Sequence, residues 1–440
     1  MKVCVIGGAG YVGLVTGLGL AELGHQVTNV DVNTDRIRQL GEGTAPIYEE
    51  DLAPLLKRHG DSQAIKFTTE IDEGMEDCGV VFVAVGTPSR ADGKPDLSQV
   101  IQVAEDLGHT LSSYTVIVIK STVPVGTVEL FLSILARTHT EGVEFDIVSN
   151  PEFLREGNAV YDFFHPDRIV IGTNSERASR VMDELYAPLL QTTPNLPVIR
   201  TSVPSAQLIK YASNAFLATR VSFINEIASL CERVGADINE VTEGMGPDPR
   251  IGHAYLTAGL GFGGPCLEKD LMALISIAES NAYEPYLLRS VLERNARQVE
   301  EVIAKVKAQT GDVLYQRIIT VYGLAFKPGT SDVRNSLSLK VIDRLQREGA
   351  SVRAHDPFAL AEAALVTSNV NLFDDPYAAA ENADSALILT AWPEYLKLDF
   401  ARIRVTMAEP RIVDACNLLS THPQLTEGFA YNGVGTLATS

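Results

Sequence analysis

The sequence predicts an α/β protein with two doubly wound sheet domains joined by a long central helical region. One observation is a strand, a glycine-rich turn, a helix and a second strand ending in an acid, all within residues 2–31. Another is that strands and helices alternate again after residue 316. Between the two regions, apolar residues follow helical spacing from residue 205 to about 308. For a chain of 440 residues we therefore expect domains at 1–203, 204–308 and 309–440.

Charge and cysteine usage limit the partners. The formal net charge is −20, so a nucleic acid or an anionic membrane surface would be repelled, and we expect neither. The cysteines are odd in number and scattered, with neither paired nor metal-like spacing: Cys4, Cys78, Cys231, Cys266 and Cys416. This pattern predicts no metal site and suits a reducing compartment. The chain enters a strand without a signal-peptide pattern, and no apolar run reaches the roughly 18 residues that cross a bilayer. We expect a cytoplasmic protein.

The first motif is a candidate dinucleotide site. A strand at 2–7 leads into Gly8-Ala9-Gly10-Tyr11-Val12-Gly13, a helical pattern follows to Leu23, and a strand at 26–30 ends at Asp31. Glycines admit a pyrophosphate to the helix N-terminus, and Asp31 can accept hydrogen bonds from a ribose hydroxyl pair. This order predicts a Rossmann-like domain, and the carboxylate favours NAD over NADP. The alternative is a turn that only packs helix against sheet.

Polar loops follow the next predicted strands, at 80–85, 115–119 and 145–148. Ligands of open α/β sheets bind at these carboxyl ends. The first two loops are Gly86-Thr87-Pro88 and Lys120-Ser121-Thr122-Val123-Pro124, and the third is residues 149–157. In the third, Glu152 and Glu156 lie four residues apart and can both face the cleft, although surface glutamates are common.

The central region opens with a long helical pattern. Residues 191–204 are rich in Thr, Pro and Asn, which suggests a domain end, and the helix is expected from Ser205 to about Val234. Lys210 and Asn214 lie four residues apart, so they project side by side. Apolar neighbours favour partial burial of Lys210, whereas the ordinary alternative is a solvated lysine. A turn-rich segment then carries Arg250, and the following long helix could serve as a hinge and a dimer surface.

The segment 261–270 reads Gly-Phe-Gly-Gly-Pro-Cys-Leu-Glu-Lys-Asp. We expect Pro265 to open the first turn of a helix and Cys266 to lie at its N-terminus, where the macrodipole favours thiolate over thiol. Asp270 follows on the same helical face. The alternative is a buried structural cysteine.

The third region repeats the alternation. Strands are expected at 317–322, 351–354, 385–389 and 411–413, a helix at 337–348, and a mobile tail from Ala430. The loop at 325–334 lacks paired glycines but offers Lys327 and Arg334, which suit a diphosphate held by side-chain charge.

A nicotinamide site combined with an activated cysteine indicates oxidation of an aldehyde. Thiolate addition gives a thiohemiacetal, loss of hydride gives a thioester, and water releases a carboxylate. Lys210 and Asn214 can stabilise the oxyanion, while Asp270 or Glu152 can move protons and position water. A second diphosphate-binding domain implies that the substrate carries its own nucleotide.

Over nearly its whole length the chain resembles the nucleotide-sugar 6-dehydrogenases, most closely those that act on UDP-glucose. The matching stretches are residues 8–13, 85–88, 121–124, 150–157, 166–172, 210 with 214, 248–252, 261–270 and 323–334. The resemblance implies oxidation of the sugar C6 alcohol to a carboxylate by two NAD molecules, without release of the aldehyde. It also implies an obligate homodimer built on the central helix.

The resemblance assigns roles to individual residues. It implies Cys266 as the nucleophile, with Lys210, Asn214, Asp270, Thr122 and Glu152 around it. The implied NAD-binding residues are Gly8, Gly10, Tyr11, Val12, Gly13, Asp31, Arg36, Thr87, Thr122 and Glu156. The implied nucleotide-sugar contacts are Phe153, Leu154, Glu156, Lys210, Asn214, Arg250, Phe262, Gly263, Phe326, Lys327 and Arg334, with Arg250 contributed across the dimer.

Two departures from the family pattern leave the sugar and base open. The residue before the cysteine is Pro265 where a serine is usual, and the two after it are Leu267 and Glu268 where an apolar residue and a proline are usual. In the third region, Ala415-Cys416 stands where Gly-Arg is usual. The alternatives are the same reaction on a UDP-N-acetylhexosamine or GDP-mannose, a two-electron β-hydroxy acid dehydrogenase, and an NAD-binding scaffold with an inert thiol.

Overall fold

The chain folds into two compact units, each built on one sheet. The computed structural model describes residues 1–440 except 91, 140 and 438–440. The first unit comprises residues 1–213 and 272–281, and the second comprises 214–271 and 282–440. The predicted α/β class with two Rossmann-like sheets is confirmed. The three-part division at residues 203 and 308 stays a prediction.

The first sheet has eight strands in the order β3-β2-β1-β4-β5-β6-β7-β8. Its first six positions follow the 3-2-1-4-5-6 order of dinucleotide-binding folds. Neighbouring strands are parallel except β6 and β7. The strands are β1 (Lys2–Ile6), β2 (Gln26–Val30), β3 (Ile65–Thr68), β4 (Val80–Val83), β5 (Thr115–Ile119), β6 (Phe145–Ser149), β7 (Ile169–Gly172) and β8 (Val198–Thr201).

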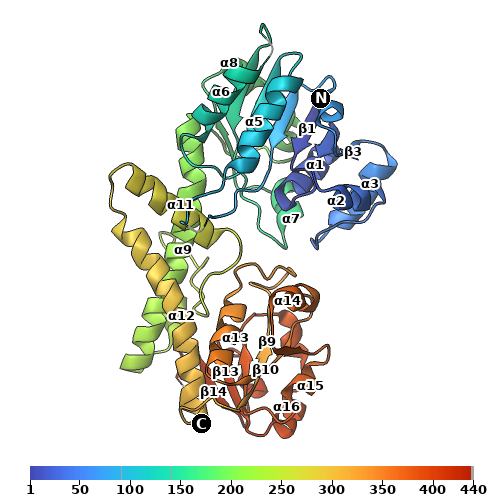
Figure 1. The fold of residues 1–440 in the computed structure, drawn as a ribbon. Helices are drawn as coiled ribbons and strands as arrows, with labels where there is room; N and C mark the ends of the chain where they lie inside the picture. The colour runs from blue at the N-terminus through green and yellow to red at the C-terminus, as the bar shows by residue number, and fades with distance from the viewer. Residues whose placement is uncertain (91, 140, 438–440) are drawn as a thin grey trace. The chain divides into compact units, whose positions relative to one another are not determined.

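Helices cover both faces of this sheet (Figure 1). Alternate residues of β1 point to opposite faces, so Val3 and Val5 join one core cluster while Cys4 and Ile6 join another. The first cluster receives α1 (Tyr11–Glu22), α3 (Leu52–Asp61), α7 (Ala159–Phe164) and α8 (Glu176–Thr192). The second receives α4 (Ile71–Met75), α5 (Ser98–Thr110) and α6 (Thr127–Thr138). The helix α2 (Thr34–Gly41) also contributes Leu40 to the first cluster.

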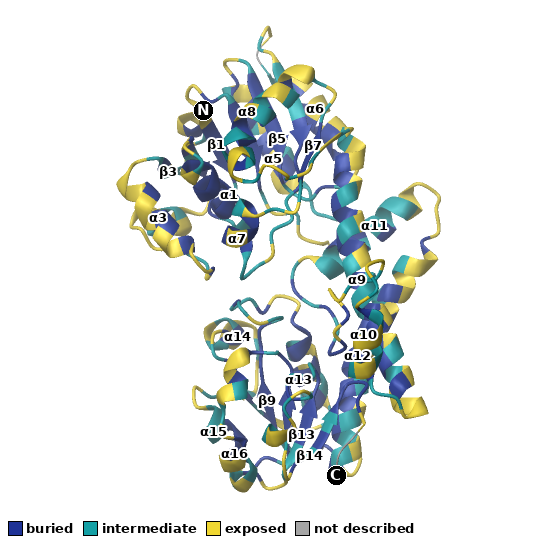
Figure 2. Ribbon diagram, turned by 180° about the vertical axis from the view of Figure 1, so that it is seen from behind, coloured by how far each residue is buried: buried dark blue, intermediate teal, exposed yellow. Residues whose placement is uncertain are grey.

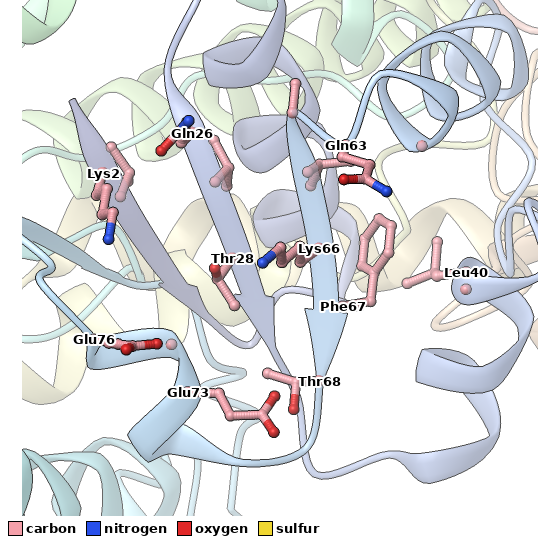
Figure 3. A pocket seen from close by; sticks show the side chains of 17 residues that line it. Lys2, Gln26, Thr28, Leu40, Gln63, Lys66, Phe67, Thr68, Glu73 and Glu76 are labelled. Atoms are coloured by element: carbon pink, nitrogen blue, oxygen red, sulfur yellow. The ribbon is translucent and has the colours of Figure 1, made fainter.

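A polar cavity of about 800 Å³ lies over β1, β2 and β3 (Figure 3). Thr28 and Lys66, which are paired in register, project into it from neighbouring strands. The residues lining it include none of those predicted to bind NAD. Because ligands of such sheets bind beyond the carboxyl ends of the strands, we do not assign the cavity to the cofactor.

The second sheet repeats the same order in six strands, β11-β10-β9-β12-β13-β14, all parallel. They are β9 (Ile318–Tyr322), β10 (Ser351–His355), β11 (Val370–Leu372), β12 (Ser385–Ile388), β13 (Arg411–Asp414) and β14 (Ala430–Gly433). Short helices lie between them: α13 (Leu337–Arg347), α14 (Leu360–Val366), α15 (Pro376–Ala380) and α16 (Phe400–Thr406), with the 3₁₀ turns η1 (Pro393–Lys397) and η2 (Pro423–Leu425). Figure 2 shows the strands buried and the outer helix faces exposed.

The central region forms four helices: α9 (Val203–Val234), α10 (Ile238–Met245), α11 (Leu267–Ser280) and α12 (Tyr286–Thr310). In the second unit, α12 packs on the sheet through Val302 and Val306, which belong to the same core as the strands. Nearer its N-terminus, α12 is tied to α9, where Arg294 donates to the Asn225 carbonyl oxygen at 2.6 Å. The helical part and the sheet of the second unit therefore share one folded body.

Several sequence expectations are corrected. The tail from Ala430 was expected to be mobile, but residues 430–433 form β14, and Tyr431 is buried with its hydroxyl on Asp414. The segment 191–204, where a domain end was expected, holds β8. The strands β3, β7, β8 and β11 were not predicted.

An acid after the second strand fixes the preceding turn in both sheets. Asp31 accepts one hydrogen bond from that turn, from the Ala9 N–H at 3.0 Å, and is half-buried. Asp356 is fully buried, and its two oxygens accept from the N–H groups of Leu324, Ala325, Phe358 and Ala359 and from the indole of Trp392. The second acid is therefore committed to structure, and it holds the loop that carries Lys327 and Arg334.

We expect Asp356→Asn to lower the free energy of unfolding of the second unit by about 3–5 kcal/mol, because either amide orientation turns an NH₂ group towards buried N–H donors. Urea unfolding followed by circular dichroism measures the change. The control is Asp343→Asn, whose carboxylate is exposed in a pair with Arg347. Equal stability of the two variants would show that Asp356 does not hold the loop.

Candidate functional site

The glycine turn leaves the start of α1 open to an anion. Gly10 is the N-cap of α1, and among the described residues no side chain caps it. A Cβ added to Gly13 would lie 2.2 Å from the Gly7 carbonyl oxygen, so the helix packs too closely on the turn for any other residue. The first amides of a helix have no partner within it and can bind a phosphate. The residues present therefore fit the pyrophosphate of a dinucleotide.

The carboxylate at the end of β2 suits the ribose. Asp31 Oδ1 accepts from the Asn33 N–H at 3.0 Å, while Oδ2 takes the Ala9 N–H. Each carboxylate oxygen accepts more than one hydrogen bond, so both can still accept from ribose hydroxyls. Arg36 donates to the Ala9 carbonyl oxygen at 3.4 Å, which places its guanidinium beside the same turn.

The loops after β4 and β5 are fastened to each other at this edge of the sheet. Thr87 Oγ1 donates to the Thr122 carbonyl oxygen at 2.9 Å, and Ser121 Oγ donates to the Val85 carbonyl oxygen at 2.6 Å. The structure therefore brings Thr87 and Thr122 together, as their positions after neighbouring strands predict.

A buried glutamate that the sequence reading missed links the glycine turn to the loop after β6. Glu49 accepts from the Tyr11 hydroxyl, from the Gly157 N–H at 2.8 Å and from the Ala159 N–H at 2.5 Å. Burial, the hydrogen bond to Glu49 and the charges of Glu49 and Glu156 raise the pKa of the Tyr11 phenol, so it stays protonated. No motif marks Glu49, which lies in an irregular acidic stretch between α2 and α3.

The loop after β6 carries a buried ion pair. Lys210 Nζ on α9 lies 2.9 Å from Glu152 Oε1, and both side chains are at most 10 % exposed. Glu152 Oε2 also accepts from the Leu154 N–H at 2.5 Å, which fixes the carboxylate within its own loop. The Phe153 ring has the Arg168 guanidinium 3.7 Å from its centre and Lys210 Nζ at 5.4 Å. Lys210 is thus buried and paired, not solvated.

A second buried lysine stands at the end of β5. Lys120 Nζ donates to Asn150 Oδ1 at 3.0 Å. Burial, the largest cause, and the Lys210 charge lower the pKa of Lys120 to about 8, against the attraction of Glu152. The sequence reading placed Lys120 in a loop and gave it no role. Its position directly after an apolar strand is the signal that predicts burial.

The candidate nucleophile lies in the second unit. Cys266 is exposed, and its carbonyl oxygen accepts the Asp270 N–H at 2.9 Å, which makes it the N-cap of α11. The expectation that Pro265 opens the first turn is wrong, because α11 begins at Leu267. Asp270 is buried, accepts from Asn214 Nδ2 at 2.6 Å and lies 2.5 Å from Lys269 Nζ. The structure therefore joins Asn214 on α9 to Asp270, which lies in the first turn of the helix α11 that follows Cys266.

Two contacts hold the loop that leads to this thiol. Asn295 on α12 accepts from the Phe262 N–H at 2.8 Å and donates to the Phe262 carbonyl oxygen at 2.9 Å. On the other side, a Cβ on Gly263 would lie 2.7 Å from the Asn335 carbonyl oxygen, and one on Gly264 would lie 2.5 Å from the Phe326 ring. The glycines therefore let the thiol loop pack directly against residues 326–335, the loop of Lys327 and Arg334.

The loop 325–334, predicted to bind the nucleotide, carries both of its cations beside residues of the same loop. Lys327 Nζ lies 5.8 Å from the centre of the Phe326 ring, and Arg334 Nη2 lies 2.5 Å from Asp332 Oδ2. Arg250 lies beyond α10 in an exposed pair with Asp248 at 2.7 Å. Within its own unit, Arg250 contacts none of the other predicted substrate residues through a described hydrogen bond.

The strand order, the open glycine turn and the acid at the end of β2 are those of a dinucleotide-binding protein. The chain belongs to the UDP-glucose/GDP-mannose dehydrogenase family: the family's NAD binding domain matches residues 1–190, its central domain residues 204–297 and its UDP binding domain residues 320–421. It is therefore an NAD-dependent nucleotide-sugar dehydrogenase.

Named relatives agree. The chain is 44 % identical to a UDP-glucose 6-dehydrogenase of Bacillus subtilis over 436 residues, covering 99 % of this chain and 93 % of the relative. It is also 44 % identical to that of Pseudomonas aeruginosa over 446 residues, with 99 % and 97 % covered. A solved UDP-glucose dehydrogenase from Pyrobaculum islandicum matches at TM-score 0.92 and 37 % identity, with 99 % and 98 % covered.

Throughout the part of the chain that the structure describes, no helix combines the length and the apolar character needed to cross a bilayer.

We expect Asn295→Ala to lower the free energy of unfolding by about 2–4 kcal/mol, because it leaves the buried N–H and carbonyl of Phe262 without their partner. Urea unfolding is the measurement. Arg297→Ala, at an exposed position on the same helix, is the matched control and should change the free energy by no more than about 0.5 kcal/mol. A loss no larger than the control would mean that Asn295 does not hold the thiol loop.

Proposed function

We propose that this protein oxidises the C6 hydroxyl of UDP-glucose to a carboxylate, giving UDP-glucuronate with two molecules of NAD per sugar. One observation carries the proposal: within the second unit, the loop bearing the exposed Cys266 thiol packs against the loop of Lys327 and Arg334. A nucleotide diphosphate held by those cations would keep its sugar near the sulfur. The substrates named for the relatives support UDP-glucose as that nucleotide sugar.

The proposed chemistry needs a nucleophile only at its second stage. The glycine turn and Asp31 would hold NAD, which would supply the hydride acceptor for each oxidation. The Cys266 thiolate adds to the aldehyde carbon to give a thiohemiacetal, which becomes a thioester when hydride leaves. Water then displaces the sulfur, and the carboxylate forms. The N-terminus of α11 favours the thiolate that begins and ends this cycle.

The buried polar groups supply the remaining roles. Lys210 and Asn214 donate to the oxygen on C6 while it carries negative charge. Glu152 and Asp270 exchange protons with that oxygen and with the attacking water, and Thr122 hydrogen-bonds within the same site. The ion pair of Lys210 with Glu152 and the hydrogen bond of Asn214 to Asp270 hold each donor beside a carboxylate.

Binding roles follow the same division. Gly8, Gly10, Tyr11, Val12, Gly13, Asp31, Arg36, Thr87, Thr122 and Glu156 would hold NAD. The nucleotide sugar would be held by Phe153, Leu154, Glu156, Arg250, Phe262, Gly263, Phe326, Lys327 and Arg334. The Arg250 side chain is exposed beside Asp248, which supports a contribution to the site of the partner subunit.

We expect wild-type protein to form two NADH per UDP-glucose and Cys266→Ser to lower steady-state formation of the acid at least about 1000-fold, because a serine hydroxyl is a far weaker nucleophile at neutral pH. NADH absorbance and product chromatography measure both, with GDP-mannose and a UDP-N-acetylhexosamine as comparison substrates. Cys78→Ser is the control, since a hydroxyl can keep the bond to the Val80 carbonyl oxygen. One NADH per sugar, or undiminished acid from Cys266→Ser, would contradict the mechanism.

A homodimer through α9 is part of the proposal. Phe216, Phe223 and Leu230 repeat every seven residues, so they share one helix face, and they are 62 %, 48 % and 51 % exposed. Apolar side chains of this size gathered on one face indicate a covered surface.

We expect light scattering to give twice the mass of one chain for the wild type and the mass of one chain for Phe223→Asp, because a carboxylate cannot be buried in an apolar interface without cost. Leu365→Asp, at an exposed leucine on α14, should remain dimeric. A wild-type mass of one chain would refute the dimer.

A further inference from the structure

Lys120 is buried in a network that does not need its charge. It is 8 % exposed at the end of β5, and its Nζ donates to Asn150 Oδ1. The Tyr186 hydroxyl donates to the same oxygen at 2.7 Å, and Asn150 Nδ2 donates to the Val170 carbonyl oxygen at 2.7 Å. The Asn150 amide therefore keeps partners on both sides without the lysine.

The charges around Lys120 do not balance. The charged groups that act on it are Glu152, which attracts the ammonium, and Lys210, which repels it. Two buried ammonium groups thus face one buried carboxylate. Tyr186 is also fully enclosed, and burial raises the pKa of its phenol, so it adds no negative charge.

A surplus buried cation opposes folding. Removing an ammonium from water is unfavourable, and here the single carboxylate is shared with Lys210. The same burial accounts for the lowered pKa of Lys120, which is about 8. At neutral pH most molecules therefore carry the second positive charge. Groups retained against stability are typical of functional sites.

We propose that Lys120 is a positioning residue for the oxidation proposed above, acting through Asn150 and through its charge on the Glu152–Lys210 pair. With the Lys120 ammonium, the three groups Lys120, Lys210 and Glu152 carry one net positive charge. This charge is balanced when the substrate oxygen becomes anionic. That oxygen is anionic as an alkoxide before each hydride leaves and again when water adds to the thioester. Asn150 stands two residues before Glu152 in the same loop, so the bond from Lys120 also fixes the start of that loop.

The inference rests on the proposed function, and its test compares variants at many pH values. Lys120→Gln keeps a donor for Asn150 but removes the charge. We expect its kcat to be about 10- to 100-fold lower than that of the wild type at pH 7, with KM for both substrates within about threefold. Above pH 9 the two should converge, because wild-type Lys120 is then neutral. Dividing the kcat of Lys120→Gln by that of the wild type at each pH removes the effect of titrating groups that the two proteins have in common.

Lys120→Arg keeps a charge that does not titrate in this range. Its rate relative to wild type should therefore rise as pH passes 8. This comparison decides the proposal even if Lys120→Gln does not fold. Tyr186→Phe is the matched control, since it removes the other bond to the same Asn150 oxygen without changing charge. It should leave the pH dependence of wild type unaltered.

Thermal unfolding separates this role from a structural one. Lys120→Gln should melt at or above the wild-type temperature at pH 7. The wild type should gain stability relative to it from about pH 8 to pH 10.5, because unfolded Lys120 binds a proton there and folded Lys120 does not. A structural lysine predicts the opposite at pH 7.

Each outcome is decisive. A pH-independent ratio of wild type to Lys120→Gln, a flat ratio of Lys120→Arg to wild type, or the same pattern in Tyr186→Phe would overturn the role of Lys120. Absence of UDP-glucose oxidation by the wild type would overturn the proposed function instead. The same ratios would then be measured with whichever nucleotide sugar of the comparison panel the wild type oxidises.

Discussion

The buried ion pair between Glu152 and Lys210 is the constraint on which the rest of the first unit's site depends. Neither charge could remain in the interior alone, so the loop after β6 must stay where α9 presents its lysine. The Leu154 N–H also donates to this carboxylate, and the Phe153 ring centre lies 5.4 Å from Lys210 Nζ. The pair thus joins two elements whose residues lie 58 positions apart in the sequence.

The two sheets use one device for two purposes. Both follow the same strand order, and both place an acid after the second strand to fix the turn after the first. Asp31 accepts hydrogen bonds from two N–H groups of the protein, so its remaining lone pairs are available to a ligand. Asp356 accepts from five donors of the protein itself, so its carboxylate is occupied by structural hydrogen bonds.

Sequence reasoning predicted the long and periodic features well. The α/β class, the glycine turn, most central strands and α9 follow from local patterns, and Lys210 was expected to be buried from its apolar neighbours. It missed β14, because the four residues of this strand mix polar and apolar types. The contact that holds the strand, from the Tyr431 hydroxyl to Asp414, is not visible in the local sequence. It could not find Glu49 or Asn295, since each acts on backbone groups far away in the chain, and nothing local to either residue records such a partner.

The accessibility of one thiol has a cost for the cell. Cys4, Cys78 and Cys231 are buried and Cys416 is half-covered, whereas Cys266 is open to solvent at a helix start that favours its anion. A thiolate that serves as the proposed nucleophile would also attack peroxide, giving a sulfenic acid that a cellular thiol can reverse. Flux through this step should therefore fall under oxidative stress and recover as the thiol pool is restored.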